Sequence, residues 1–203
     1  MPPVQQRQTN LRFEGITGPK RPTRSARRLA AFAQWTVRSI SPRATQGLLI
    51  CGSLRVRCAL GRSGSAVLKR EGDGTTPIGE WRLSSVLYRS DRIRRPRTLL
   101  PLKSIRPKDG WCDAPDDRRY NRAVLLPYPA SSEALWRSDQ VYDIVIILDY
   151  NGKPRRRNAG SAIFAHVSRP GFSPTEGCIA LPEKDLRNLL AVSGRHARIR
   201  AGL

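Results

Sequence analysis

The chain has 203 residues, which is enough for one domain of ordinary size and an extension. It carries 37 Lys and Arg against 16 Asp and Glu, and the formal net charge of +21 favours anionic partners such as phosphates, carboxylates or a charged surface. No apolar run approaches the roughly 18 to 20 residues that a membrane-spanning helix requires, so the sequence excludes a helical membrane protein.

Residues 1–45 contain nine Lys or Arg and one Glu among Pro, Gln, Thr and Ser. This composition predicts a basic, largely disordered extension. Within it, residues 25–40 place Leu29, Phe32 and Trp35 on one side of an amphipathic helix. Such a helix could lie on an anionic membrane surface or on the domain, and a poorly ordered tail is the alternative. The segment lacks the apolar middle of a secretory signal, so it does not indicate export.

Residues 46–203 predict a mainly β domain, because short apolar runs alternate with Gly, Pro and Asn. Two runs flank Gly52 and Ser53, a dipeptide typical of a tight hairpin turn. Further strands are expected at 79–88 (GEWRLSSVLY) and within 142–152 (YDIVIILDYNG), where the run is apolar enough to be buried on both faces.

The last part of the chain predicts a strand, a loop, a strand and a helix. In 160–167 (GSAIFAHV), Ile163 falls on one side, and Phe164 and His166 fall on the other. After the loop, "GCIAL" predicts a strand, and the stretch from Pro182 to Gly194 carries start and stop signals of a helix. A short final strand follows, and one late helix among many strands favours a mainly β fold.

The segment "AHVSRPGFSPTEGCIALP" places His166 and Cys178 on either side of a turn-rich loop. A thiol becomes a good nucleophile only with a base in reach and with donors for the oxyanion. Two prolines and one glycine between the two residues suit a loop that doubles back, and the backbone amides of Gly177 and Cys178 can serve as oxyanion donors. Spacing alone leaves an inert, buried Cys178 as the alternative.

The remaining cysteines and the second histidine have plainer interpretations. Cys51 and Cys58 lie inside apolar runs and are expected in the core, whereas Cys112 lies in a polar, turn-like segment and is the rival nucleophile. His196 lies among arginines, where an exposed or packing role is expected. The cysteines show neither a CxxC pair nor a zinc-like Cys/His spacing, so no structural metal is expected.

The order of "GSAIFAHV", loop, "SPTEGCIAL" and helix resembles the L,D-transpeptidase catalytic domain, whose signature is a histidine followed after a loop by Ser or Thr, His, Gly and Cys. The upstream "KREGDG" segment, the turn Thr76–Gly79 and "WCDAPDDRRYNR" resemble a compact branch of that family, and the likeness spans 47–201. It implies a β-sandwich with one or two short helices, the principal helix following Cys178.

The resemblance also implies the chemistry. Cys178 would be the nucleophile, His166 the general base and then acid, and Gly177 a backbone donor to the oxyanion. The enzyme would cleave a peptidoglycan stem peptide with release of D-alanine, and an amine of a second stem would then attack the thioester. This reaction needs no metal and no organic cofactor, and carbapenems, which resemble the acyl donor, are expected to acylate Cys178.

The chain departs from the family signature at Glu176, where relatives carry histidine. A carboxylate there would disfavour the Cys178 thiolate unless it pairs with His166 or an arginine, so Glu176 is expected to orient a neighbour or the incoming amine. Position 180 is Ala where many relatives carry Arg or Asn, so another residue must recognise the substrate carboxylate. Candidate substrate-binding residues are Thr175, Glu176, Arg169, Tyr120 and Arg122, with Arg118 and Arg119 beside the last two, and a solvated run of charges is the alternative for each arginine.

Two other functions stay open at this point. An L,D-carboxypeptidase passes through the same acyl-enzyme, with water in place of the amine. A basic protein that binds nucleic acid or an anionic surface would fit the charge, but the domain has no aromatic and basic recognition motif and its arginines are scattered. The resemblance implies the periplasm or cell envelope of a bacterium.

Overall fold

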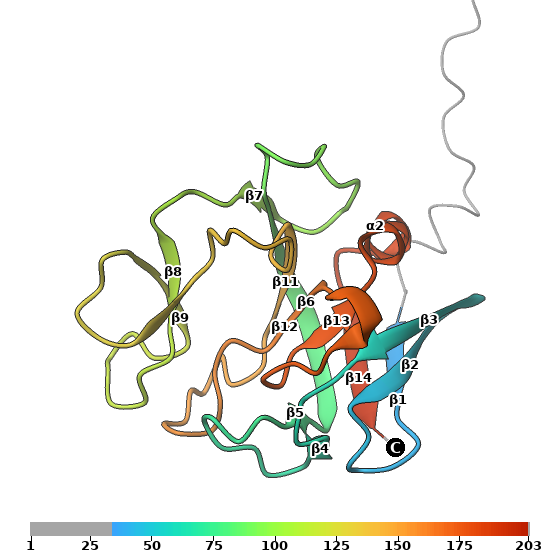
Figure 1. Cartoon of the computed structure of the whole chain (residues 1–203), viewed down its shortest axis with the longest axis horizontal. Helices are drawn as coiled ribbons and strands as arrows, with labels where there is room; N and C mark the ends of the chain where they lie inside the picture. Colours follow the sequence, from blue (N-terminus) through green and yellow to red (C-terminus); the bar gives the residue numbers. More distant parts are fainter. Residues whose placement is uncertain (1–33, 203) are drawn as a thin grey trace, which may run out of the picture.

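The computed structural model describes residues 34–202. Nine strands form the main sheet in the order β11-β12-β13-β3-β2-β1-β14-β6-β7, and β11 also pairs with β6. That pairing closes the eight strands from β11 to β6 into a barrel (Figure 1). In chain order the strands of the sheet are β1 (Gln34–Arg38), β2 (Gln46–Cys51), β3 (Leu54–Ala59), β6 (Gly79–Tyr88), β7 (Leu102–Ser104), β11 (Ile144–Leu148), β12 (Phe164–Val167), β13 (Ile179–Leu181) and β14 (Arg198–Gly202).

Apolar side chains from these strands fill the barrel. The core includes Trp35, Leu49 and Ile146, all fully buried, and it also takes in Cys51 and Cys58 as expected. Helix α2 (Glu183–Val192) adds leucines to the same core, begins after Pro182 and ends before Gly194, as its start and stop signals predicted. The mainly β fold with its principal helix after Cys178 is therefore confirmed, with the sheet closed on itself.

The tight turn at Gly52 is also confirmed, because β2 and β3 pair antiparallel on either side of it. Gly52 has φ of +58°, a conformation that favours glycine and suits a two-residue hairpin turn.

The prediction of an N-terminal helix over residues 25–40 is wrong for its last part. Residues 34–38 form strand β1, which pairs parallel with β14 and antiparallel with β2. Trp35 and Val37 point into the barrel core, and burying these side chains outweighs the helical periodicity of the segment. The folded region thus begins by Gln34, and the rest of the predicted helix and the basic extension before it lie outside the described residues.

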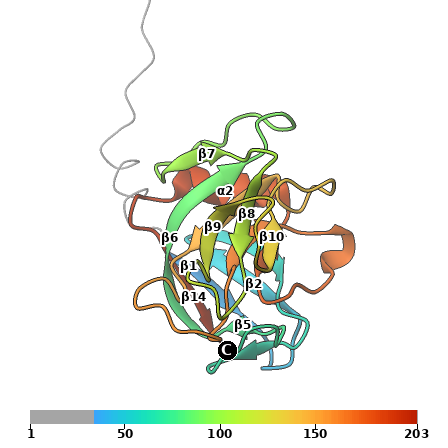
Figure 2. The ribbon, with the colours of Figure 1, turned by 90° about the vertical axis from the view of Figure 1, so that its left-hand side faces the viewer.

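A smaller sheet lies against the outside of the barrel. It consists of β8 (Asp109–Cys112), β9 (Arg122–Leu125) and β10 (Ser132–Ala134), and Figure 2 shows it in front of the barrel strands. A second apolar cluster fills the space between the two sheets and includes Trp111, Phe164 and Cys178. The small sheet therefore covers the face of β12 that points away from the barrel core.

The expectation of a polar, turn-like position for Cys112 is wrong. Cys112 ends strand β8, pairs with Arg122 and Ser132 on its two neighbours, and is fully buried. Both neighbours lie downstream of it in the chain, so the strand pairing that buries Cys112 is not visible in its local sequence.

Three short elements complete the described chain. Strands β4 (Ser65–Ala66) and β5 (Thr76–Pro77) pair with each other, and the 3-10 turn η1 (Pro170–Phe172) lies in the loop before Cys178. Gly61 forms an isolated bridge with Thr175, which ties this loop to the segment after β3.

Candidate active site

Cys178 lies immediately before β13, which pairs parallel with β12. Its Sγ accepts a hydrogen bond from the Phe164 amide at 3.4 Å and donates one to the Ala162 carbonyl at 3.1 Å. The side chain is largely buried, with 8% of the residue exposed. The parallel register of β12 and β13 therefore holds the thiol next to the strand that carries His166.

His166 lies on the face of β12 opposite the barrel core, as its alternation predicted. Its Nδ1 is 2.9 Å from the Val167 carbonyl oxygen. A carbonyl only accepts, so Nδ1 carries the proton and Nε2 keeps a free lone pair. The ring also packs edge-on against Tyr142, with centroids 5.4 Å apart. These contacts fix both the tautomer and the orientation that a general base requires.

The pKa values of the pair favour two neutral partners at rest. Burial lowers the pKa of His166 to about 4. Burial also raises the pKa of Cys178 to about 12, with the Glu133 carboxylate adding to the rise. The resting site is therefore a thiol beside a neutral imidazole, and the thiol must give up its proton during attack.

Both side chains line one cleft, which we call the Cys178 cleft, with a volume of about 470 Å³. Acidic and basic groups line it together with the nucleophile. Its charged side chains are Glu71, Asp113, Glu133, Arg137, Arg169 and Glu176. The cleft thus offers a substrate both carboxylates and guanidinium groups close to a thiol.

Gly177 and Thr175 shape the turn that delivers Cys178. Gly177 has φ of +128°, and a Cβ there would lie 2.6 Å from the Thr75 carbonyl oxygen, so only glycine fits. The Thr175 hydroxyl donates to the Cys178 carbonyl at 2.7 Å and accepts from the Gly177 amide at 3.1 Å. Thr175 thus braces the turn. The Gly177 amide is already engaged, which leaves the Cys178 amide as the better oxyanion candidate.

Glu176, the departure from the family signature, pairs with Arg62. The Arg62 guanidinium donates from Nε to both carboxylate oxygens, at 2.8 and 3.0 Å, and both side chains are more than half exposed. Arg62 also donates to the Gly72 carbonyl. Because an arginine offsets its charge, Glu176 raises the pKa of Cys178 less than an unpaired carboxylate would.

Lys69 is a site residue that we did not predict. Its side chain is 1% exposed and pairs with Asp73 at 2.7 Å. Its Nζ lies 3.2 Å from the position that a Cβ at Gly177 would occupy, and its charge lowers the pKa of Cys178. The "KREGDG" segment contains it, but nothing in the local sequence indicates that this lysine lies beside Gly177.

Glu133 and Tyr142 also line the Cys178 cleft, although the spacing of residues in the sequence did not indicate this. The Tyr142 hydroxyl donates to Glu133 Oε1 at 2.6 Å, and the Arg137 guanidinium lies over the Tyr142 ring. Tyr142 precedes β11 and Glu133 lies in β10, so the small sheet delivers this pair to the barrel wall. Only the packing of the two sheets brings them to His166.

Of the remaining predicted substrate-binding residues, the structure places only Arg169 in the Cys178 cleft. Arg169 lines the Cys178 cleft and pairs with Asp139 at 3.2 Å. Tyr120 is buried and does not line the cleft, but its hydroxyl donates to Glu71, which does.

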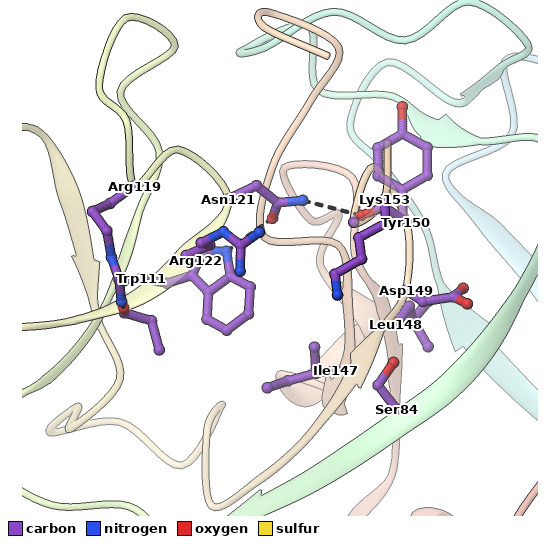
Figure 3. Close-up of a pocket in the computed structure, with 12 residues that line it drawn as sticks. Ser84, Trp111, Arg119, Asn121, Arg122, Ile147, Leu148, Asp149, Tyr150 and Lys153 are labelled. Carbon is purple, nitrogen blue, oxygen red and sulfur yellow. Dashed lines mark hydrogen bonds between the residues drawn. The ribbon is translucent and has the colours of Figure 1, made fainter. Parts of the chain in front are cut away.

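Arg122 lies elsewhere. Together with Arg119 and Trp111 it lines a separate pocket of about 540 Å³, while Arg118 is exposed. Figure 3 shows that pocket, in which Asn121 donates to the Tyr150 carbonyl. Arg122 is therefore not part of the Cys178 cleft, and the exposed His196 is not among the residues that line it.

Among residues 34–202, no three His, Cys, Asp or Glu side chains gather as a metal site would require. No helix within the same range is long and apolar enough to cross a membrane. The reactive groups of the cleft are a buried thiol and an imidazole of fixed tautomer, and its walls carry charged side chains.

Comparison with known proteins agrees with that chemistry. No curated protein sequence matches the chain. The family model YkuD, described as the L,D-transpeptidase catalytic domain, matches residues 44–194, which span β2 to α2 and include every residue of the Cys178 cleft. The chain belongs to the L,D-transpeptidase catalytic domain family.

Proposed function

We propose that this protein is a peptidoglycan L,D-transpeptidase with Cys178 as nucleophile and His166 as general base and acid. The observation that carries the proposal is that the Cys178 thiol lines the same cleft as the neutral imidazole of His166, whose tautomer is set by the Val167 carbonyl. The family acts on peptidoglycan stem peptides, and the acyl donor here would be a stem whose terminal D-alanine leaves.

The first half-reaction forms the acyl-enzyme. The Cys178 Sγ attacks the carbonyl carbon of the scissile amide as its proton passes to His166 Nε2. The Cys178 amide faces the developing oxyanion and stabilises it. The imidazolium then protonates the departing amine, D-alanine leaves, and a thioester on Cys178 remains.

The second half-reaction returns the enzyme to its starting state. An amine attacks the thioester carbonyl and gives its proton to the neutral His166. The carbon–sulfur bond breaks, and the imidazolium returns the proton to the departing sulfur. The energy of the first amide is kept in the thioester, so a cross-link forms without ATP.

Carbapenem acylation tests the nucleophile directly. Intact-protein mass after exposure to a carbapenem is expected to show one adduct per chain. The adduct should disappear in Cys178→Ala and persist in Cys112→Ala, because Cys112 is buried within the small sheet. An adduct that persists in Cys178→Ala would contradict the assignment.

Hydrolysis by the same acyl-enzyme is the second candidate, because Cys178 opens into a cleft that water can also enter. Muropeptides separated by mass distinguish the two. Cross-linked stems that depend on Cys178 would support transfer, whereas trimmed stems alone would support an L,D-carboxypeptidase. We place either reaction in the bacterial cell envelope, in the periplasm, and cell fractionation that finds the protein only in the cytosol would contradict this.

A further inference from the structure

We propose that Asp113, Glu71 and Ser161 form a subsite in the Cys178 cleft for the primary ammonium group of the acyl acceptor. The inference rests on the proposed transfer reaction and names the residues that select an amine over water. The acceptor is the side-chain amine of the second stem that the proposed reaction already requires.

The first observation is an imbalance of charge within the cleft. Arg137 and Arg169 are both paired with Asp139, at 2.8 and 3.2 Å. Glu176 is paired with Arg62. In contrast, Glu71 and Asp113 make no ion pair with any residue in the described range 34–202. In a chain of net charge +21, two carboxylates without a cation in an open cleft favour a cationic ligand.

The second observation is independent of charge. Ser161 is 6% exposed and lines the same cleft, yet its Oγ has no hydrogen-bond partner among residues 34–202. The buried Oδ1 of Asp113 likewise has none within that range. Buried polar atoms almost always have a partner, so two such atoms in one cleft indicate a ligand that supplies hydrogen bonds.

The chemistry of these groups identifies the ligand. A carboxylate only accepts hydrogen bonds, and a hydroxyl can accept as well as donate. A primary ammonium has three donors and no acceptor, which matches acceptors on Asp113, Glu71 and Ser161. A carboxylate or phosphate would instead meet like charge at the first two residues.

Tyr120 holds Glu71 in position for this role. Its buried hydroxyl donates to Glu71 Oε2, and the backbone of Gly160, the residue before Ser161, lies against the same hydroxyl. Glu71 and Ser161 are therefore fixed near one another. Tyr120 is a positioning residue for this subsite, and it does not contact the substrate.

Binding as an ammonium is compatible with attack as an amine. The bound ammonium first loses one proton to solvent, because only the neutral amine has a lone pair with which to attack the thioester. During the attack the nitrogen loses a second proton, and the Nε2 lone pair of His166 takes it. The new nitrogen–carbon bond forms as the carbon–sulfur bond breaks, and the proton then passes from His166 to the Cys178 sulfur. The subsite therefore concentrates the acceptor, and His166 activates it.

Binding to an inactive variant tests the subsite without turnover. The full chain carrying Cys178→Ser is titrated by NMR with Nα-acetyl-L-lysine amide, which carries the primary ammonium and is the charged probe. The Nε-acetylated analogue of this compound is the uncharged probe. Adding Asp113→Asn or Glu71→Gln is expected to raise the Kd of the charged probe about tenfold, as expected for a lost charged hydrogen bond. Asp116→Asn is the matched control, because its carboxylate lies on the same loop and is 99% exposed.

Product partition in the active chain gives the second readout. With a donor stem peptide and the lysine amide, Asp113→Asn should lower the ratio of transfer to hydrolysis, and Asp116→Asn should leave it unchanged. If the Asp113 and Glu71 variants bind both probes as the parent does, the subsite is wrong even when transfer proceeds. If the charged probe binds selectively but no thioester ever forms, the proposed reaction fails and the ammonium site stands.

Discussion

Cys58 and Cys178 are both buried thiols whose pKa is raised to about 12 by desolvation, but their surroundings differ. Cys58 lies on β3 inside the barrel, among apolar side chains. Cys178 lies on the outer side of the sheet, in a cleft that it shares with His166, Glu133 and Arg137. The candidate nucleophile is therefore not distinguished by a low resting pKa. It is distinguished by its access to a cleft and by the imidazole that shares this cleft.

The largest expected effect comes from removing the base. His166→Ala should lower the rate of Cys178 acylation by about 10² to 10⁴, the usual contribution of a positioned proton acceptor. Stopped-flow measurement with a carbapenem gives this rate. His196→Ala, which changes the other, exposed histidine, is the control. Equal rates in both variants would mean that the cleft alone makes Cys178 reactive.

Lys69→Met is expected to have the next largest effect. Because the Lys69 ammonium lowers the pKa of Cys178, its loss should raise that pKa and slow acylation by about tenfold at neutral pH. The pH–rate profile should move to higher pH, and Lys69→Arg should restore part of the rate. The exposed Lys103→Met serves as the control. A slower rate without any movement of the profile would indicate a purely structural role for Lys69.

The buried imidazole should make stability depend on pH in a defined window. The pKa of His166 is about 4 in the folded chain against an ordinary 6.5, so the unfolded chain binds more protons between these values. The free energy of unfolding should therefore fall as pH drops from about 6.5 to 4. Denaturant titrations of His166→Gln should show a flatter dependence across this window, whereas Cys58→Ala should keep the slope of the parent.

The smallest effect is expected at the exposed pair of Arg62 and Glu176. Exposed ion pairs contribute about 0 to 1 kcal/mol, so Arg62→Ala should change the free energy of unfolding by no more than this. It should also raise the pKa of Cys178 slightly, because Glu176 then lacks its partner. Thiol alkylation against pH measures the shift. If Arg62→Ala shifted the pKa of Cys178 more than Lys69→Met does, the charge of Glu176 would influence the thiol more strongly than the charge of Lys69, contrary to this prediction.

Much of the fold was predictable because its signals are local. The hairpin at Gly52, the strand Gly79–Tyr88, the alternation around His166 and the helix after Pro182 all follow from neighbouring residues. Strand β1 was not predictable from its local sequence, because Trp35 and Val37 fit a helix as well as a strand. Only their pairing with β14 and β2 decides between the two. Cys112 was mistaken for a turn residue for the same reason.

The site divides in the same way. The sequence by itself determined that His166 and Cys178 lie on either side of one short loop, whose glycine and prolines indicate its shape. Only the tertiary structure decided that Glu133, Tyr142, Asp113 and Ser161 line the same cleft as the thiol, that Lys69 lies beside Gly177, and that Arg122 lines a different pocket. The physical reason is that barrel closure and the packing of the small sheet set distances between residues far apart in the chain, on which local sequence carries no information.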